Sequence, residues 1–332
     1  MRVGVVAIGR NEGERLVRCL TSLQGRAEAI VYVDSGSTDK SIAHAKSLGA
    51  IVVELDTSIP FTAARARNAG FARLAELHPN VTYVQFVDGD CELQQGWLET
   101  AAAYLDENAD VAVVAGRRRE RFPDATVLNR LADMEWDTPI GEATEVGGDI
   151  LIRREVFEAI DGYDAGMIAG EDPELCLRVR HARHRVMRID AEMTLHDADM
   201  HALQQWWKRV VRAGHAYAEG AHMHPGYRLR ELRSIVWWGG AVPTVAVGAA
   251  PITLGASLAM GAAGYGLLWS RIYRYRRDRD DPTKHAALYA TATTVGKIAE
   301  MRGVLQYAWN TFVRRQKSEL IEYKGVSGGP SR

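Results

Sequence analysis

The chain has few cysteines, and their spacing gives no sign that they act together. Only three occur in 332 residues, Cys19, Cys91 and Cys176, and no two of them form a C-x-x-C pair. An odd number of widely spaced cysteines argues against both a disulfide framework and a zinc site. The sequence therefore favours a reducing, cytoplasmic setting.

Signatures of several other protein classes are also missing. No G-x-G-x-x-G follows the first apolar segment, which argues against a dinucleotide-dependent oxidoreductase. We find no internal repeat and no low-complexity segment. The first residues offer about six apolar positions before polar ones return, fewer than the core of a signal peptide. We expect the chain to enter its first strand directly.

Charge is unevenly distributed along a chain that is nearly neutral overall. The net charge is −1, yet residues 271–332 carry 13 lysines and arginines against 6 aspartates and glutamates. That end of the chain therefore has a net charge of +7, and residues 1–270 have −8. The composition, 47% apolar, is sufficient for a large core. The sequence predicts an acidic globular body followed by a basic C-terminal portion.

Apolar segments alternate with helical patterns over the first two thirds of the chain. Strands are predicted at residues 3–8, 30–33, 51–55, 83–87, 111–114 and 150–152. Helices are predicted at residues 12–23, 63–77, 95–105, 154–160, 172–182 and 201–219, and a capped one after residues 37–39. Residues 117–146 lose the alternation and predict a loop with a short helix. The pattern indicates an α/β nucleotide-binding sheet flanked by helices.

The segment VQFVDGDCE, residues 84–92, is the most informative motif. An apolar strand ends there in Asp88 and Asp90, separated by Gly89. Open α/β sheets bind ligands at the carboxyl ends of their strands, and carboxylate oxygens suit Mg²⁺ or Mn²⁺, which in turn suit a diphosphate. Alone, the motif is weak, because aspartates at strand ends more often cap a helix or lie in a solvated turn.

Other polar residues follow the second strand and begin a helix further on. Asp34 ends the segment VYVD, where its carboxylate can accept hydrogen bonds from a base or ribose. Asp39 is better explained as part of a helix cap formed by S-T-D. Arg65 and Arg67 point to different faces of their helix, so one of them can meet phosphates while the other is solvated.

Two motifs after residue 146 supply candidates for the reacting centre. Gly147 and Gly148 precede a strand and permit close approach of a sugar, although they also suit a bulge. Glu171 and Asp172 begin a helix, where carboxylates commonly interact with the helix dipole. The alternative role is a general base that accepts a proton from an attacking hydroxyl.

Taken in order, these segments resemble the family 2 glycosyltransferases of the GT-A fold. The matching segments cover roughly residues 3–215 and read VAIGRNEGERLVRCLTSL, VDSGSTD, ARNAG, VDGD, GGDILIRREVFEAIDGYD and GEDPELCLRVR. A GT-A type sheet that binds a nucleotide-diphosphate sugar is what the resemblance implies for the fold. The segment IGRNE stands where the family often has a proline, a small departure.

The resemblance also assigns roles to residues. It implies that Asn11, Asp34, Arg67 and Asp88 bind the nucleotide, that Asp90 binds the divalent cation, and that Asp172 is the base of an inverting transfer. Gly147, Gly148 and Glu171 would lie on the acceptor side. His196 is the candidate to complete the metal site, although seven of the ten histidines lie between residues 181 and 224 and a core or surface role stays open.

Residues 235–270 carry no charge and are rich in glycine and alanine. This stretch is too long for one simple transmembrane helix and short for two, and arginines and aromatic residues flank both ends. We expect a helical hairpin that dips into a membrane from the cytoplasmic side; a buried pair of helices in a soluble protein is the alternative. Beyond it, an apolar face next to basic residues predicts an interfacial helix over about residues 297–317. Its predicted apolar face comprises Ile298, Met301, Leu305, Ala308 and Phe312.

The expected protein thus has a catalytic domain at residues 1–225 and a membrane-associating helical region at residues 226–332. We expect a metal-dependent hexosyltransferase in cell-surface or lipid-linked polysaccharide synthesis, with Mn²⁺ or Mg²⁺ and most commonly a UDP-sugar. The segment QQWWKR lacks the tryptophan after Arg209 that processive synthases carry, so we expect transfer of one sugar.

The expected partners are the donor, a glycan or lipid-linked acceptor and a membrane, without nucleic acid; a homo-oligomer stays open. The expected location is the cytoplasmic face of the cell membrane, with the cytoplasm as the alternative. Two alternative functions are a nucleotidyltransferase, which usually has an early glycine-rich phosphate loop that residues 8–15 lack, and a catalytically silent nucleotide-sugar-binding module at the membrane.

Overall fold

The computed structural model describes residues 2–316 and divides into two compact units. Unit 1 comprises the chain up to Phe122 together with Glu135–Asp199, and unit 2 comprises Pro123–Met134 and the helices from Met200 onward. The helix α8, expected in the catalytic domain, groups by its contacts with unit 2. The predicted domain boundary at residue 225 stays a prediction.

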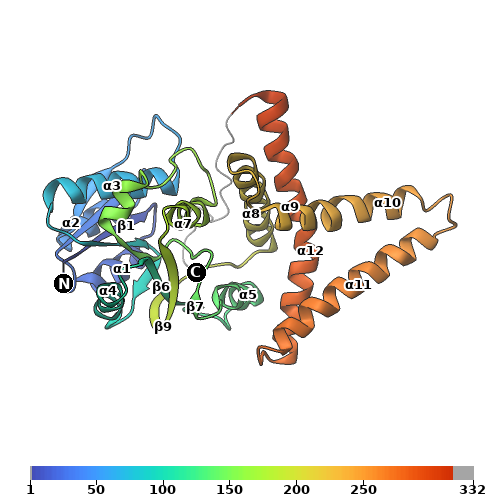
Figure 1. The fold of residues 1–332 in the computed structure, drawn as a ribbon, viewed down its shortest axis with the longest axis horizontal. Coiled ribbons are helices and arrows are strands. Elements are labelled where there is room, and N and C mark those ends of the chain that lie inside the picture. Colours follow the sequence, from blue (N-terminus) through green and yellow to red (C-terminus); the bar gives the residue numbers. More distant parts are fainter. Residues whose placement is uncertain (1, 317–332) are drawn as a thin grey trace. The chain divides into compact units, whose positions relative to one another are not determined.

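Unit 1 alternates strands and helices, as the sequence pattern predicts (Figure 1). Its strands are β1 (Val3–Gly9), β2 (Ala29–Asp34), β3 (Ile51–Glu54), β4 (Tyr83–Asp88), β5 (Cys91–Leu93), β6 (Val111–Glu120), β7 (Gly141–Glu142), β8 (Ile150–Arg153) and β9 (Arg185–His196). Its helices are α1 (Glu14–Leu23), α2 (Ser41–Ser47), α3 (Ala63–Leu77), α4 (Trp97–Glu107), α6 (Arg154–Ala159) and α7 (Glu171–His181), while α5 (Val127–Trp136) crosses into unit 2.

The nine strands found among residues 2–316 form one mixed sheet. Its order is β3-β2-β1-β4-β8-β6-β9-β5, with β7 paired to β9. The strands β1 to β4 are mutually parallel, so their carboxyl ends meet at one edge, where Gly9 pairs with Asp34 and Ile8 pairs with Asp88. The predicted ligand-binding edge is therefore present, with the second strand and the D-x-D motif on either side of β1.

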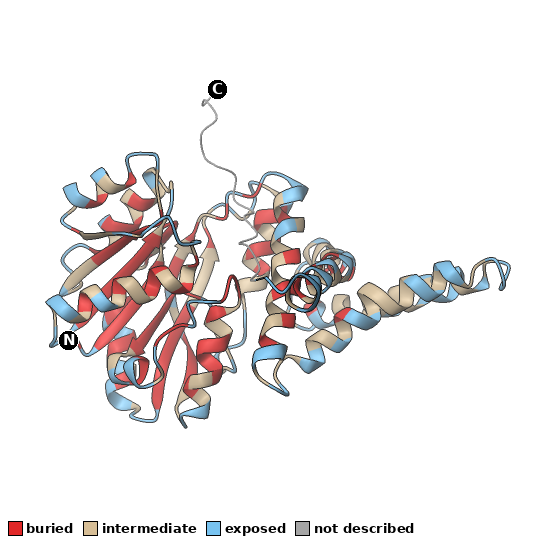
Figure 2. Ribbon diagram, turned by 90° about the horizontal axis from the view of Figure 1, so that it is seen from above, coloured by how far each residue is buried: buried red, intermediate tan, exposed pale blue. Residues whose placement is uncertain are grey.

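Apolar strands and close helix packing build the core of unit 1. The central strands are almost completely buried (Figure 2). The helix α3 lies against β1 and β2 at Gly70, where a Cβ atom would come within 2.4 Å of Val6 Cγ1. Glycine at this position allows the helix to approach the sheet closely.

One predicted strand proved too short. The strand expected at residues 111–114 continues to Glu120, because residues 117–120 pair with the last part of β9. Consecutive arginines at 117–119 conceal the strand, since they interrupt the apolar pattern while their backbones complete the sheet. The short helix predicted within residues 117–146 is α5, whereas the short strand β7 in the same region was not predicted.

Unit 2 is helical. Its helices are α8 (Leu203–Met223), α9 (Leu229–Ile235), the π-helix η1 (Val236–Ala241), α10 (Val242–Gly248), α11 (Ala256–Arg277), α12 (Thr283–Ala308) and the π-helix η2 (Trp309–Arg314). Glycines bring α8 and α12 together, since a Cβ on Gly214 would lie 2.0 Å from Glu300 O and one on Gly303 would lie 2.0 Å from Val211 O. The predicted helical hairpin is formed by α10 and α11.

Within residues 2–316, no helix is both long enough and apolar enough to cross a bilayer. The predicted interfacial helix corresponds to α12 and η2, and Lys317 lies outside the described residues. Its small residues, among them Ala299 and Gly303, are buried. Ile298, Leu305 and Phe312 of the predicted apolar face remain exposed.

Candidate active site

The D-x-D motif occupies the turn between β4 and β5. Gly89 passes next to β1, since a Cβ there would lie 3.0 Å from Ile8 O. The side chain of Asp88 remains 30% exposed, whereas that of Asp90 is buried. The two carboxylates therefore differ in environment, with Asp88 open to a ligand and Asp90 held within the protein.

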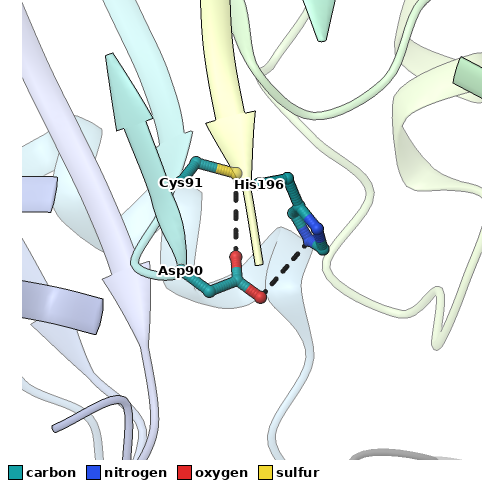
Figure 3. A group of neighbouring side chains, drawn as sticks. All are labelled: Asp90, Cys91 and His196. Atoms are coloured by element: carbon teal, nitrogen blue, oxygen red, sulfur yellow. Dashed lines mark hydrogen bonds and ion pairs between the residues drawn. The ribbon is translucent and has the colours of Figure 1, made fainter. Parts of the chain in front are cut away.

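Asp90 lies beside His196, the histidine that the sequence singled out (Figure 3). The Asp90 Oδ2 atom is 3.3 Å from His196 Nε2, and the thiol of Cys91 donates to Asp90 Oδ1 at 3.7 Å. Sheet register explains the meeting, because His196 on β9 pairs with Cys91 on β5 and with Glu120 on β6. His196 Nδ1 faces Glu120 Oε2 at 3.8 Å.

The chemistry of this group fits a hard divalent cation. Ligand atoms of Asp90, Cys91 and His196 lie within 4.8 Å of one another. Burial, together with the charge of Arg118, lowers the pKa of His196, which keeps the imidazole neutral as a metal ligand must be. Burial raises the pKa of Cys91, so its thiol stays protonated. The carboxylate of Asp90 and the imidazole of His196 therefore remain as metal ligands, and this pair suits Mn²⁺.

A neighbouring acidic group is neutralised by the protein itself. Asp88, Cys91 and Asp149 also bring three possible ligand atoms together. The guanidinium of Arg118 approaches all three, at 3.5 Å from Asp88 Oδ2, 3.5 Å from Asp149 Oδ2 and 3.4 Å from Cys91 Sγ. Since a cation already balances this charge, the pair Asp90 and His196 is the better metal site.

Arg67 joins three of the other predicted site residues. Its Nη1 atom donates to Glu171 Oε1 and Asp172 Oδ1, each at 2.9 Å, and its Nη2 atom donates to Asp88 Oδ1 at 2.9 Å. The arginine is buried, and Gly148 makes room for it, since a Cβ there would lie 2.1 Å from Nη2. Its predicted contact with the nucleotide remains a prediction.

Asp172 has the environment of a general base. It is the second residue of α7, whose N-cap Gly170 has a left-handed backbone (φ 83°). Burial raises the pKa of Asp172 to about 7, against the opposing effect of Arg67. A carboxylate with this pKa is poised to exchange a proton near neutral pH.

Asn11 and Asp34 shape the loop after β2. Asp34 is buried and accepts hydrogen bonds from the backbone of Gly36 and Ser37 and from the hydroxyl of Tyr32. Asn11 Oδ1 accepts the backbone N–H of Thr38 at 2.7 Å. Both residues thus lie at the expected edge, and their nucleotide-binding role stays a prediction.

The remaining predicted residues have local explanations. Asp39 lies one residue before the N-cap of α2, which is Lys40 and has no side-chain cap hydrogen bond; it accepts the backbone N–H groups of Ser41 and Gly13 instead. Arg65 binds backbone carbonyls of Ile59 and Asp56 and so holds a loop. Gly147 lies near Arg118, since a Cβ at this position would lie 3.7 Å from Nη1.

Sequence reasoning missed Arg118, Glu120 and Asp149. Glu120 accepts the backbone N–H groups of Phe122 and Ala198 beside His196. Asp149 accepts the hydroxyl of Thr194 at 2.9 Å and the backbone N–H of Asp88 at 3.1 Å. A signal existed for Asp149, which directly follows the glycine pair, whereas Arg118 and Glu120 lay in the segment read as a loop.

The mixed α/β sheet flanked by helices, with a D-x-D turn at the carboxyl end of β4, is a fold like that of the GT-A class of nucleotide-sugar glycosyltransferases. Residues 5–161 match the family model described as Glycosyl transferase family 2. The matched residues, which lie within unit 1 apart from Pro123–Met134, therefore belong to family 2 of the glycosyltransferases.

Known proteins resemble the chain over most of its length. It is 26% identical over 239 residues to a pre-mycofactocin glycosyltransferase of Mycobacterium tuberculosis, covering 67% of this chain but 48% of that protein. It is 26% identical to the succinoglycan biosynthesis protein ExoA of Rhizobium meliloti, covering 75% and 81% of the two chains. The fold matches mannosyltransferase PcManGT from Pyrobaculum calidifontis, solved with GDP-Man and Mn²⁺, with a TM-score of 0.65, 16% identity and coverages of 93% and 87%.

Proposed function

We propose that the protein is a metal-dependent, inverting glycosyltransferase that moves one sugar from a nucleotide-diphosphate sugar to an acceptor hydroxyl. The observation that carries the proposal is that the buried guanidinium of Arg67 bonds to both Asp88 and Asp172. It fixes a carboxylate with a pKa of about 7 beside the D-x-D turn. A donor bound at the turn would thereby present its sugar to a base.

The residues divide the work of the reaction. Asp90 and His196 would hold the divalent cation, which when bound supplies positive charge for the diphosphate leaving group. Asp172 accepts the proton of the acceptor hydroxyl while the hydroxyl oxygen bonds to the anomeric carbon. The bond from that carbon to the nucleoside diphosphate breaks on the opposite face, and the diphosphate departs. Arg67 keeps Asp172 in place for that proton transfer.

We infer that the acceptor belongs to a cell-surface or lipid-linked saccharide. Similarity to a succinoglycan biosynthesis protein over 75% of the chain supports this acceptor class. UDP is the first nucleotide to test because it is the one most common in the family, and GDP follows because the Pyrobaculum structure holds GDP-Man.

A thermal-shift assay of the full-length protein tests the donor and the metal together. UDP, GDP, CMP and dTDP are each added with Mn²⁺ or with a chelator. One nucleotide should stabilise the protein only with Mn²⁺, by about 2.7 kcal/mol at 100 times its Kd. Asp90→Ala should abolish this stabilisation and the transfer. Equal stabilisation in the presence of the chelator would exclude the proposed metal dependence.

Asp172→Asn tests the base. The variant should bind donor normally and lose about 10²- to 10⁴-fold in turnover, since an amide cannot accept the proton. Glu155→Gln is the matched control, because Glu155 also lies in the first turn of a helix and is exposed. NMR of the product should show inverted anomeric configuration. Retained configuration, or a loss below about tenfold, would contradict the assignment.

A further inference from the structure

We propose that the α10–α11 hairpin inserts its tip into one leaflet of an anionic phospholipid membrane. The tip is the turn formed by residues 249–255. The contacts of unit 2 alone support this inference, so it stands independently of the catalytic chemistry proposed for unit 1.

Among the described residues, much of the apolar surface of the hairpin is exposed, most of all at its tip. No residue of η1 or α10 is buried, and Arg276 is the only buried residue of α11 (Figure 2). At the tip, Ile252 is 87% exposed and Leu254 is 96% exposed. Isolated apolar residues are ordinary on a surface, but a continuous apolar projection marks an interaction site.

Charge along the hairpin matches a membrane surface. Residues 234–270 carry none, whereas Arg271, Arg274 and Arg277 are exposed on the last turns of α11, away from the tip. Trp269 and Tyr273 stack at that same end, with ring centroids 5.0 Å apart. Aromatic rings and arginines at the boundary of an apolar segment fit the headgroup layer and its negative charge.

Four side-chain hydroxyls of the hairpin form hydrogen bonds within it. The hydroxyl of Ser257 donates to Ala246 O at 2.7 Å, and that of Thr253 donates to Ala249 O at 2.8 Å. Ser270 donates to Gly266 O at 2.7 Å, and the hydroxyl of Tyr265 reaches Trp238 O. Such internal bonding is what a hydrocarbon environment demands, because it offers no water as a partner.

The turn itself holds its leucine outward. Leu254 adopts a left-handed backbone, with φ 50°, a conformation more usual for glycine or asparagine. The backbone N–H groups of Ile252, Thr253 and Gly255 all donate to carbonyls at residues 249–250. A strongly apolar residue thus occupies the most exposed position of a compact, internally bonded turn.

Length limits how deep the hairpin reaches. The uncharged part of α11, from Ala256 to Ser270, is about 22 Å long at 1.5 Å per residue. The hydrocarbon core of a bilayer is about 30 Å thick. The tip therefore ends within the membrane, and the chain returns to the side from which it entered.

A fluorescent label at the tip tests the insertion directly. All three native cysteines are buried, so Leu254→Cys introduces the only exposed thiol for an environment-sensitive dye. Vesicles containing phosphatidylglycerol should shift its emission to the blue. Leu203→Cys, at a position 71% exposed in α8, is the matched control and should not shift. A shift that needs no vesicles and grows with protein concentration would overturn the proposal in favour of a second copy of this chain.

A sedimentation assay tests whether the tip drives binding. The double substitution Ile252→Ser and Leu254→Asn keeps a residue suited to the left-handed position and removes two large apolar groups. Binding to the same vesicles should fall at least about tenfold. Val127→Ser with Leu203→Ser, which removes exposed apolar groups elsewhere in unit 2, should leave binding unchanged. Equal binding by both variants would overturn the proposal; an unchanged melting temperature of each variant verifies folding.

Discussion

Gly148 leaves the space that the guanidinium of Arg67 occupies. Gly148→Ala places a Cβ 2.1 Å from Arg67 Nη2, so the guanidinium must move away from Asp88 and Asp172. We expect turnover to fall about 100-fold, as displacements near 1 Å do, with the protein still folded. Gly147→Ala is the control, since its nearest neighbour would lie at 3.7 Å. Comparable steady-state rates for the two variants would contradict this role.

The pKa of Asp172 sets the pH dependence of the reaction. Since burial raises it to about 7 and the base must be ionised, turnover should rise about tenfold per pH unit below 7 and level off above it. Arg67 lowers the pKa of Asp172, so Arg67→Met should raise this pKa and shift the rising part of the rate profile to higher pH. Rates measured from pH 5 to 9 with saturating donor test the direction of this shift. If the rate profile of Arg67→Met does not shift, a group other than Asp172 titrates.

Among the elements, α8 and α12 are held at a distance that only glycine allows. Gly303→Ala would bring a Cβ to 2.0 Å from Val211 O and should destabilise unit 2 by about 1–3 kcal/mol. Gly266→Ala is the control on α11, where nothing lies within 4 Å, and should stabilise its helix by about 0.5–1 kcal/mol. Urea unfolding of the full-length variants measures both, and similar midpoints would refute the packing argument.

How far the sequence predicts the structure depends on what positions each element. Strands such as β1 and β4 were predictable because burial on both faces requires a nearly continuous apolar run, which only Gln85 interrupts in the buried part of β4. The second half of β6 was not, since its side chains are arginines and only its backbone pairs with β9. Asp90 and Asp172 stand out as motifs, but the network of Arg118 and Asp149 exists only once distant strands align.

For the whole molecule, metal binding should add to stability because Asp90 and His196 come from segments far apart in the chain. Mn²⁺ alone should raise the melting temperature, with about 2.7 kcal/mol of added stability at 100 times its Kd. His196→Gln should remove this effect, and His181→Gln, at an exposed position on α7, should keep it. Calorimetric scans with and without Mn²⁺ decide the matter, and an undiminished effect in His196→Gln would exclude this histidine as a ligand.

The sheet order has a consequence for synthesis on the ribosome. The strand β5 leaves the ribosome soon after β4, yet in the sheet three strands separate them, and β5 pairs with β9. About 90 further residues must be translated before that partner exists, on the order of 5–20 s at typical elongation rates. A nascent chain arrested before residue 185 should therefore expose β5 to protease and chaperones, whereas β1, β2 and β4 already have one another. Limited proteolysis of arrested chains of increasing length would show the chain length at which Asp90 and His196 first come together.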